Sequence, residues 1–422
     1  MCEIFGQLAD DLKADELLDS QDCTFAVKFC AEMSGVFGNE TNRQESANNL
    51  LSEYFDHRVS PTVVGKQCTT DSTLQAQCGQ NAARAFIVYS RVDKSELCGS
   101  HSSPDVQGVG YYLVKLAEDS STFTRDRCVC PALLATLAGP NMSLSCAFNG
   151  LKTAVDPMVP LLPLLVLRHD KPMMETVARM LKATKLCIPR LIGFYASLPE
   201  TALSDFERGQ LAYPYPRSFE YLGTLVGFVY RRQCDTKLVF ECSVSDISES
   251  TSSSTASASA SASGSDVEGR ALAVGTELVV KFARTYCEEM HLMCHAFNQS
   301  APALYSVKNL PGGWIMLVME RVSGAHFEPK KESKAVCEML EDVVKHVHSA
   351  GMVHADLRPN NIMVAEDKTR LCLIDFDWAG HADKTRYPLF MNRIDIVWAD
   401  EVGDGKVLKP AHDDYWLEQL VV

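Results

Sequence analysis

The stretch Met352–Val364, MVHADLRPNNIMV, decides the fold of the second half of the chain. Its frame of Met, Val and Ile encloses polar side chains at four positions: His354, Asp356, Arg358 and Asn361. A polar group buried without a hydrogen-bond partner is costly, so a chain rarely gathers several of them beside apolar segments without a use. The pattern therefore indicates a built polar site.

The flanking segments predict the elements that hold this stretch. Upstream, SKAVCEMLEDVVKHVHSAG predicts a helix that ends at Gly351 and buries one face, formed by Val336, Leu340, Val343 and Val347. Downstream, AEDKT joins two short strands, at 361–364 and 370–374. Before them we expect a small sheet with a helix at 285–297, its strands at 237–243, 277–282, 303–307 and 314–320.

Two further motifs fit the same chemistry. Lys281 lies in the apolar strand LVVKFA, and Asp375 lies at the end of LCLIDFD. Phosphoryl transfer from a nucleotide needs a cation on the phosphates, a carboxylate that orients the acceptor, and oxygen ligands for Mg²⁺. The order Lys, HxDxxxxN, DF is that of a protein kinase.

Through VVKF, HADLRPNN and LIDFD, residues 215–422 resemble the protein-kinase-like superfamily. The resemblance implies ATP and Mg²⁺ as cofactors and a protein Ser or Thr hydroxyl as acceptor. Lys281 would hold phosphates, Asn361 and Asp375 would bind Mg²⁺, and His354 would brace the loop. The expected catalytic set is Lys281, His354, Asp356 and Arg358.

The resemblance also implies a partner for Lys281 and an adenine site. The partner should come from TYCEEMHLMCH, where Glu289 is preferred to Glu288 because Met293 follows one turn later on the same face. LVMERVSG would be the hinge, with backbone groups of Glu320 and Val322 meeting adenine.

Several departures keep other functions open. No GxGxxG precedes Lys281, since Gly223 and Gly227 are the only glycines nearby. Ala355 stands where typical protein kinases carry Arg, Asp377 replaces the Gly of DFG, and no APE follows. The alternatives are a nucleotide-binding pseudokinase scaffold and a small-molecule kinase.

A narrower resemblance covers the whole chain. HADLRPNNIMV, LIDFDWAG, RYPLFMN and HDDYWLEQL are similar to a fungal protein-kinase-like family related to crinkler-type proteins. That family implies an α+β architecture: an α/β domain resembling PD-(D/E)XK nucleases at 1–211, then a bilobal kinase-like domain at 212–422. The segment 248–266, rich in Ser and Ala, predicts a disordered insert within a hairpin.

The first domain lacks part of the nuclease chemistry. Val92 occupies the Glu position of the E-x-K motif, and valine cannot bind a metal. The remaining candidates are Lys94, Glu96 and Gln107, with Asp71 upstream. We therefore favour a structural or partner-binding remnant over a nuclease.

Composition excludes some classes. The 422 residues carry a formal charge of -14, which disfavours a nucleic-acid partner. The sixteen scattered cysteines and the acidic start, MCEIFGQLADDLKADELL, predict an intracellular protein of cytoplasm or nucleus. MVPLLPLLVL, at 158–167, is about half the ~20 residues of a membrane span and is expected in the core. The oligomeric state is not readable.

Overall fold

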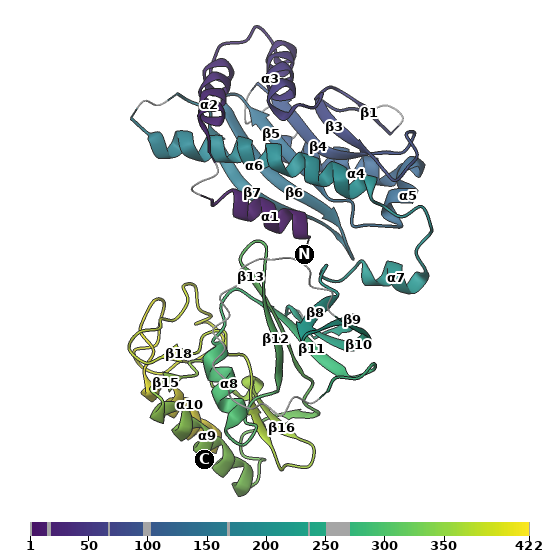
Figure 1. Cartoon of the computed structure of the whole chain (residues 1–422). Coiled ribbons are helices and arrows are strands. Elements are labelled where there is room, and N and C mark those ends of the chain that lie inside the picture. Colours follow the sequence, from purple (N-terminus) through teal and green to yellow (C-terminus); the bar gives the residue numbers. More distant parts are fainter. Residues whose placement is uncertain are drawn as a thin grey trace. The chain divides into compact units, whose positions relative to one another are not determined.

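The computed structural model describes residues 2–14, 18–65, 68–95, 103–166, 169–234, 237–249 and 271–421. The chain divides into two compact units, unit 1 at Met1–Pro216 and unit 2 at Arg217–Val422 (Figure 1). The boundary predicted near residue 212 falls just before this division. Within the described ranges, no helix has both the length and the apolar character to cross a bilayer.

Unit 1 is organised around a mixed five-stranded sheet with the order β3-β4-β5-β6-β7. β4 and β5 are parallel, whereas the other neighbours are antiparallel. Parallel neighbours cannot be joined by a tight turn, so the chain crosses over through helix α4. The bounds are β3 Ser72–Gln77, β4 Ala85–Lys94, α4 Pro104–Ala117, β5 Ala132–Ala138, β6 Asn141–Asn149 and β7 Thr153–Pro163.

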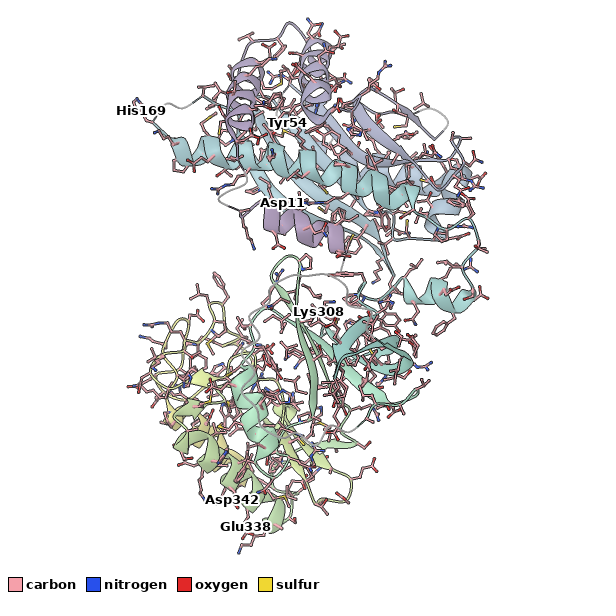
Figure 2. The ribbon with its side chains drawn as sticks, in the orientation of Figure 1. Asp11, Tyr54, His169, Lys308, Glu338 and Asp342 are labelled. Carbon is pink, nitrogen blue, oxygen red and sulfur yellow. The ribbon has the colours of Figure 1, made fainter. Side chains whose placement is uncertain are left out.

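Further helices cover this sheet. The longest, α6, packs on β3 and β4 and also contacts α1 and α2. Tyr54 of α3 donates a hydrogen bond to Asp22 of α2 over 2.7 Å, which ties these helices together (Figure 2). The remaining bounds are α1 Glu3–Asp11, α2 Ser20–Met33, α3 Glu40–Phe55, β1 Val63–Val64, β2 Cys68–Thr69, α5 Thr122–Arg125, α6 Lys171–Ala196 and α7 Asp205–Gln210.

The apolar run at 158–167 is an edge strand rather than uniform core. Most of it lies in β7, the last strand of the sheet. Val159, Leu162 and Leu164 are buried, but Leu161 is 38% exposed. The expectation of a fully buried segment was therefore wrong in part, because only one face of an edge strand meets the core and prolines are tolerated on its open edge.

Unit 2 begins with a six-stranded antiparallel sheet in the order β12-β13-β11-β10-β9-β8. The predicted strands and the predicted helix all form, with bounds shifted by a few residues. The bounds are β8 Ser218–Tyr221, β9 Thr224–Gln233, β10 Val239–Glu249, β11 Glu277–Ala283, α8 Glu288–Ala296, β12 Leu304–Leu310 and β13 Trp314–Glu320.

The first two residues of the insert expected at 248–266 belong to a strand. Ser248 and Glu249 belong to β10, where they pair with Leu225 and Thr224 of β9. The rest of the expected insert, 250–266, lies outside the described residues. Its flanking strands β10 and β11 are antiparallel neighbours, so the hairpin interpretation of these strands is confirmed.

The remainder of unit 2 packs around helix α9, Lys334–Ser349. The residues predicted for its inner face are buried, and Gly351 has φ +72°, a left-handed conformation that suits glycine after a helix. Smaller elements follow: β14 Gly324–His326, β15 Met352–Val353, β16 Ile362–Ala365, β17 Leu371–Leu373, β18 Gly380–His381 and α10 Pro410–Val421. β16 and β17 form the predicted hairpin, and α9 and α10 pack together.

Candidate active site

The loop after β15 gathers polar side chains around the buried carboxylate of Asp356. Arg358 binds it twice, from Nε to Oδ1 at 2.5 Å and from a terminal guanidinium nitrogen to Oδ2 at 2.8 Å. Asn361 donates from Nδ2 to Oδ2 over 2.8 Å and to the backbone carbonyl oxygen of Asp356 over 2.9 Å. The hydrogen bonds to Asp356 raise the pKa of Arg358, so the guanidinium stays charged.

Asp413 of α10 hydrogen-bonds to the backbone of the same loop. Its carboxylate accepts hydrogen bonds from the backbone amides of His354, over 2.7 Å, and Ala355, over 2.9 Å. Ala355 has φ +71°, a conformation that costs a non-glycine residue about 1–2 kcal/mol. The buried carboxylate of Asp413 therefore stabilises a strained loop, a role that the sequence did not reveal although HDDYWLEQL was singled out.

His348 of α9 is linked to this carboxylate. Its Nε2 lies 3.3 Å from Asp413 Oδ2, and its Nδ1 lies 3.6 Å from Asp414 Oδ1. Burial alone would lower the pKa of His348, but the hydrogen bond to Asp413 and the charges of Asp413 and Asp414 together outweigh it and raise the pKa above its usual value. The protonated ring is thus favoured in the folded state.

This link predicts a pH-dependent stability. A group whose pKa is higher in the folded state contributes its stability below the unfolded pKa and loses it as pH rises through the folded pKa. We expect the wild type to lose up to about 1 kcal/mol relative to His348→Gln on going from pH 6 to pH 8.5. Urea unfolding followed by tryptophan fluorescence measures this in unit 2 alone, because that unit holds all four tryptophans: Trp314, Trp378, Trp398 and Trp416. Parallel pH curves for the two proteins would contradict it.

The end of β17 brings Asp375 to the same loop. The backbone amide of Ile374 donates to the carbonyl oxygen of Asn361 over 2.9 Å, and His354 Nε2 lies 3.1 Å from the carbonyl oxygen of Ile374. Asp375 itself has φ +69°, which places it in the left-handed region. His354 therefore contacts the residue before Asp375, and its bracing role stays a prediction.

The side chain of Lys281, in β11, contacts Asp375 and Asp377. Its Nζ lies 2.5 Å from Asp375 Oδ1 and 2.5 Å from Asp377 Oδ1. Burial alone would lower the pKa of Lys281, but the charges of Asp375 and Asp377 outweigh it and raise the pKa. Burial raises the pKa of Asp377 to about 6, whereas Lys281 holds the pKa of Asp375 below its usual range against the effect of burial. The site therefore places one ammonium between two carboxylates.

Part of unit 2 matches a known protein family. Residues 285–395 match the family model described as the protein kinase domain. The matched segment contains Asp356, Asn361 and Asp375, and Lys281 lies just before it. Unit 2 contains a protein kinase-like domain.

Curated relatives of the kinase-like domain are protein kinases. Mitogen-activated protein kinase 13 of Homo sapiens is 42% identical over 65 residues, which are 15% of this chain and 17% of that protein. Stress-activated protein kinase JNK of Suberites domuncula is also 42% identical over 65 residues, 15% of this chain and 18% of that protein. The chain thus spans less than a fifth of the length of these two relatives.

A solved structure is also similar, the Cydia pomonella granulovirus kinase PK-1. The TM-score is 0.31 at 15% sequence identity, over 45% of this chain and 64% of that one. A score at this level does not assign a fold.

The expected pair between Lys281 and Glu289 is not formed. The Glu289 side chain is 68% exposed and lies 3.3 Å from His381 Nε2. The inner face of α8 instead carries Met290, His291 and Cys294, and the ring of His291 stacks on Phe376 at 4.9 Å. Sequence spacing alone predicted the wrong helix phase, because the buried histidine takes the place expected for an apolar residue.

The predicted hinge residues have different surroundings. Glu320 at the end of β13 accepts two hydrogen bonds from Arg370, at 2.9 and 3.0 Å, and its amide donates to Ala303. The side chain and the amide of Glu320 therefore already have hydrogen-bond partners. Any hydrogen bond from Glu320 to adenine would have to use its backbone carbonyl group. Val322 is half-buried just beyond the strand. The adenine role of both residues stays a prediction.

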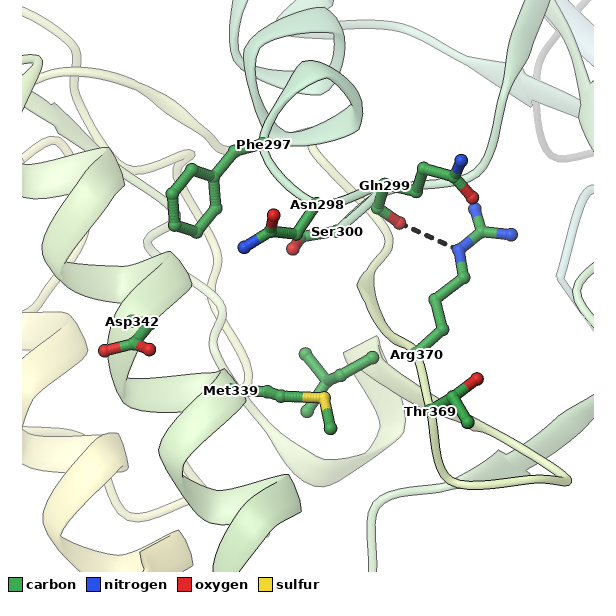
Figure 3. Close-up of a pocket in the computed structure, with 9 residues that line it drawn as sticks. Phe297, Asn298, Gln299, Ser300, Met339, Asp342, Thr369 and Arg370 are labelled. Carbon is green, nitrogen blue, oxygen red and sulfur yellow. Dashed lines mark hydrogen bonds between the residues drawn. The ribbon is translucent and has the colours of Figure 1, made fainter.

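A cavity of about 440 Å³ lies elsewhere in the domain (Figure 3). It is lined by residues 297–300, by Met339 and Asp342 of α9, and by residues 369–371. Arg370 closes one side by donating to the carbonyl oxygen of Gln299 over 2.8 Å. None of the predicted site residues lines this cavity, so its size does not mark the candidate active site.

Lys237 is a further cation at the site that the sequence did not suggest. It lies in the connection between β9 and β10, and its Nζ is 3.6 Å from Asp375 Oδ2. Val239 pairs with Lys281 across β10 and β11, so strand alternation puts Lys237 on the face of Lys281. Gly223 and Gly227 belong to the turn before β9 and to β9 itself. The β9–β10 hairpin thus brings a second lysine to Asp375.

In unit 1 the nuclease-like residues form internal pairs. Lys94 lies 3.3 Å from Glu40, and Asp71 accepts the amide of Asp93 over 3.0 Å. Val92 packs in an apolar cluster, whereas Asp93 points to the opposite face and pairs with the buried Arg91. Gln107 contacts Tyr111, and Glu96 lies outside the described residues. Within the described ranges, no group of three or more His, Cys, Asp or Glu has the geometry to hold a metal.

Proposed function

We propose that the kinase-like domain transfers the γ-phosphoryl group of ATP to a Ser or Thr hydroxyl of a protein, with Mg²⁺ as cofactor. The observation that carries this proposal is that Lys281 bonds to Asp375 and Asn361 bonds to Asp356, while the amide of Ile374, next to Asp375, donates to the carbonyl oxygen of Asn361. Three of these residues fall within the segment that matches the protein kinase domain.

The residues at the site fit a magnesium ion. Asn361 uses its side-chain nitrogen on Asp356, which leaves its Oδ1 as an oxygen ligand, and its backbone carbonyl oxygen accepts from Ile374, the residue before Asp375. Two protein oxygens completed by phosphates and water are the set that Mg²⁺ commonly takes in phosphoryl-transfer sites. When bound, the metal neutralises charge that develops on the phosphates during transfer. Asn361 and Asp375 would hold it.

The remaining residues position the two substrates. Lys281 would leave Asp375 and bind the α and β phosphates. Asp356 would accept the hydrogen of the acceptor hydroxyl, with Arg358 and Asn361 keeping its carboxylate in one orientation. In this mechanism the protein contributes mainly positioning and charge, and it forms no covalent bond with the phosphoryl group.

Lys237 would take the place of a glycine-rich loop. Backbone amides normally cover the phosphates, whereas here a second ammonium lies within 3.6 Å of the metal-binding carboxylate. We expect Lys237→Ala to weaken ATP binding about tenfold, equivalent to about 1.4 kcal/mol, and to leave adenosine binding unchanged. Lys334→Ala removes the same charge from the exposed start of α9 and serves as the control. Equal losses for ATP and adenosine would contradict a phosphate contact.

One observation favours a second candidate, the nucleotide-binding pseudokinase. Lys281 is engaged by both Asp375 and Asp377, so ATP must displace the charged contact to Asp375 before it binds in the catalytic geometry. Thermal shift with ATP and Mg²⁺, measured beside phosphate transfer to a mixed Ser/Thr peptide library, separates the candidates. Binding stabilises the folded protein in both cases, but only a kinase labels peptides. A phosphoproteomic comparison of the wild type with Asp375→Ala would then identify the acceptor.

A further inference from the structure

The residue after Phe376 distinguishes this site, because Asp377 stands where a glycine was expected. We propose that Asp377 is the positioning residue for Lys281, and that it replaces a carboxylate from helix α8. This inference rests on the proposed kinase function, because it names the group that keeps the phosphate-binding ammonium in place.

The contacts of Lys281 carry the first step. Its Nζ is equally close to Asp375 and Asp377, at 2.5 Å each. Asp375 would hold the metal when nucleotide is bound, and its carboxylate would then be drawn away from Lys281. Asp377 is then the carboxylate that remains to orient the ammonium. Its own backbone is fixed, because Thr285 Oγ1 donates to its carbonyl oxygen over 2.8 Å.

Helix α8 offers no alternative partner in this arrangement. Glu288 and Glu289 are both exposed. The helix cannot simply turn them inward, because the amide of Cys287 donates to the carbonyl oxygen of Phe376 over 3.0 Å and His291 stacks on the Phe376 ring. A rotation that brought Glu289 to Lys281 would break both contacts and expose the buried His291.

The placement of Asp377 has a regulatory consequence. A lysine that depends on a helix-borne carboxylate is released whenever the helix swings away. Here the partner lies two positions from the metal-binding Asp375 in the same segment. The ammonium and the metal-binding carboxylate therefore stay together whether or not α8 moves, so a swing of α8 does not switch the site off.

A double-mutant cycle in the full-length protein tests the contact without relying on activity. Urea midpoints are measured by tryptophan fluorescence for Lys281→Met, Asp377→Asn and the double variant. We expect the urea midpoint of the double variant to be no lower than the lower midpoint of the two single variants, because either change alone already breaks the pair. The same cycle with Glu289→Gln should be additive. Additivity for Asp377 together with coupling for Glu289 would overturn the proposal.

Kinetics test the positioning role. With a wild type that transfers phosphate, Asp377→Asn should lower kcat about a hundredfold with a much smaller change in KM, and Asp377→Glu should recover part of kcat. Glu338→Gln on the exposed face of α9 is the charge-matched control (Figure 2). A larger loss in Glu289→Gln than in Asp377→Asn would overturn the proposal. If the wild type transferred no phosphate but the double-mutant cycle showed coupling between Lys281 and Asp377, the proposed kinase function would be wrong and the contact would be supported.

Discussion

Asp356→Asn is expected to lower phosphate transfer by about a thousandfold while ATP still binds. The substitution keeps the size of the side chain but removes the charge that accepts the acceptor's hydrogen, a contribution that is typically 10²–10⁴-fold. Arg358 and Asn361 surround this carboxylate, so the loss should appear in kcat rather than in the affinity for nucleotide. Incorporation of labelled phosphate into a Ser/Thr peptide library measures it.

The matched control for this variant is Asp367→Asn. Asp367 lies exposed in the turn between β16 and β17, where its side chain accepts only a local amide from Thr369. Its activity should stay within about twofold of the wild type. Transfer by Asp356→Asn at a similar level would remove Asp356 from the mechanism, and the kinase proposal would then lose its acceptor-orienting group.

Asp413→Ala is expected to give the largest loss of stability, about 3–5 kcal/mol in unit 2. The change leaves two buried backbone amides, those of His354 and Ala355, without their hydrogen-bond acceptor. It also removes the partner of His348. It also releases the left-handed conformation at Ala355 that orients Asp356. Urea unfolding followed by tryptophan fluorescence measures the stability loss, and kcat should fall with it.

The neighbour Asp414 provides the control for this second prediction. It lies on the same helix, is 54% exposed and contacts only the far side of His348 at 3.6 Å. Asp414→Ala should therefore change the free energy of unfolding by less than about 0.5 kcal/mol. If Asp413→Ala and Asp414→Ala proved equally mild, the carboxylate of Asp413 would not be the anchor of the catalytic loop.

Sequence reasoning succeeded where the chemistry is local. Asp356, Arg358 and Asn361 occupy a single short loop, so their spacing alone predicted that they would meet. The inner face of α9 and the β16–β17 hairpin were also predictable, because helical period and turn residues are properties of short segments. Local spacing could not predict that Lys281 and Asp375 meet. That expectation came from the order of the three motifs along the chain.

Sequence reasoning failed where contacts join distant segments. Asp413 binds amides more than fifty positions away, and no local pattern marks it as different from Asp414. The contacts of Lys237 with Asp375 and of Asp377 with Lys281 could be recognised only once the strand register and the path of the chain after Phe376 were known. Glu289 was misplaced because the sequence did not show that His291 lies with Met290 on the buried face of α8, and one position along a helix turns a side chain through about 100°.

A structure of the full-length chain with Mg²⁺ and a non-hydrolysable ATP analogue tests the central claim most directly. The account predicts the metal between Asn361 and Asp375, the ammonium of Lys281 on the phosphates while still in contact with Asp377, and the γ-phosphate facing Asp356. Nucleotide bound elsewhere, or phosphates out of reach of Lys281 with no metal at Asn361 and Asp375, would contradict it.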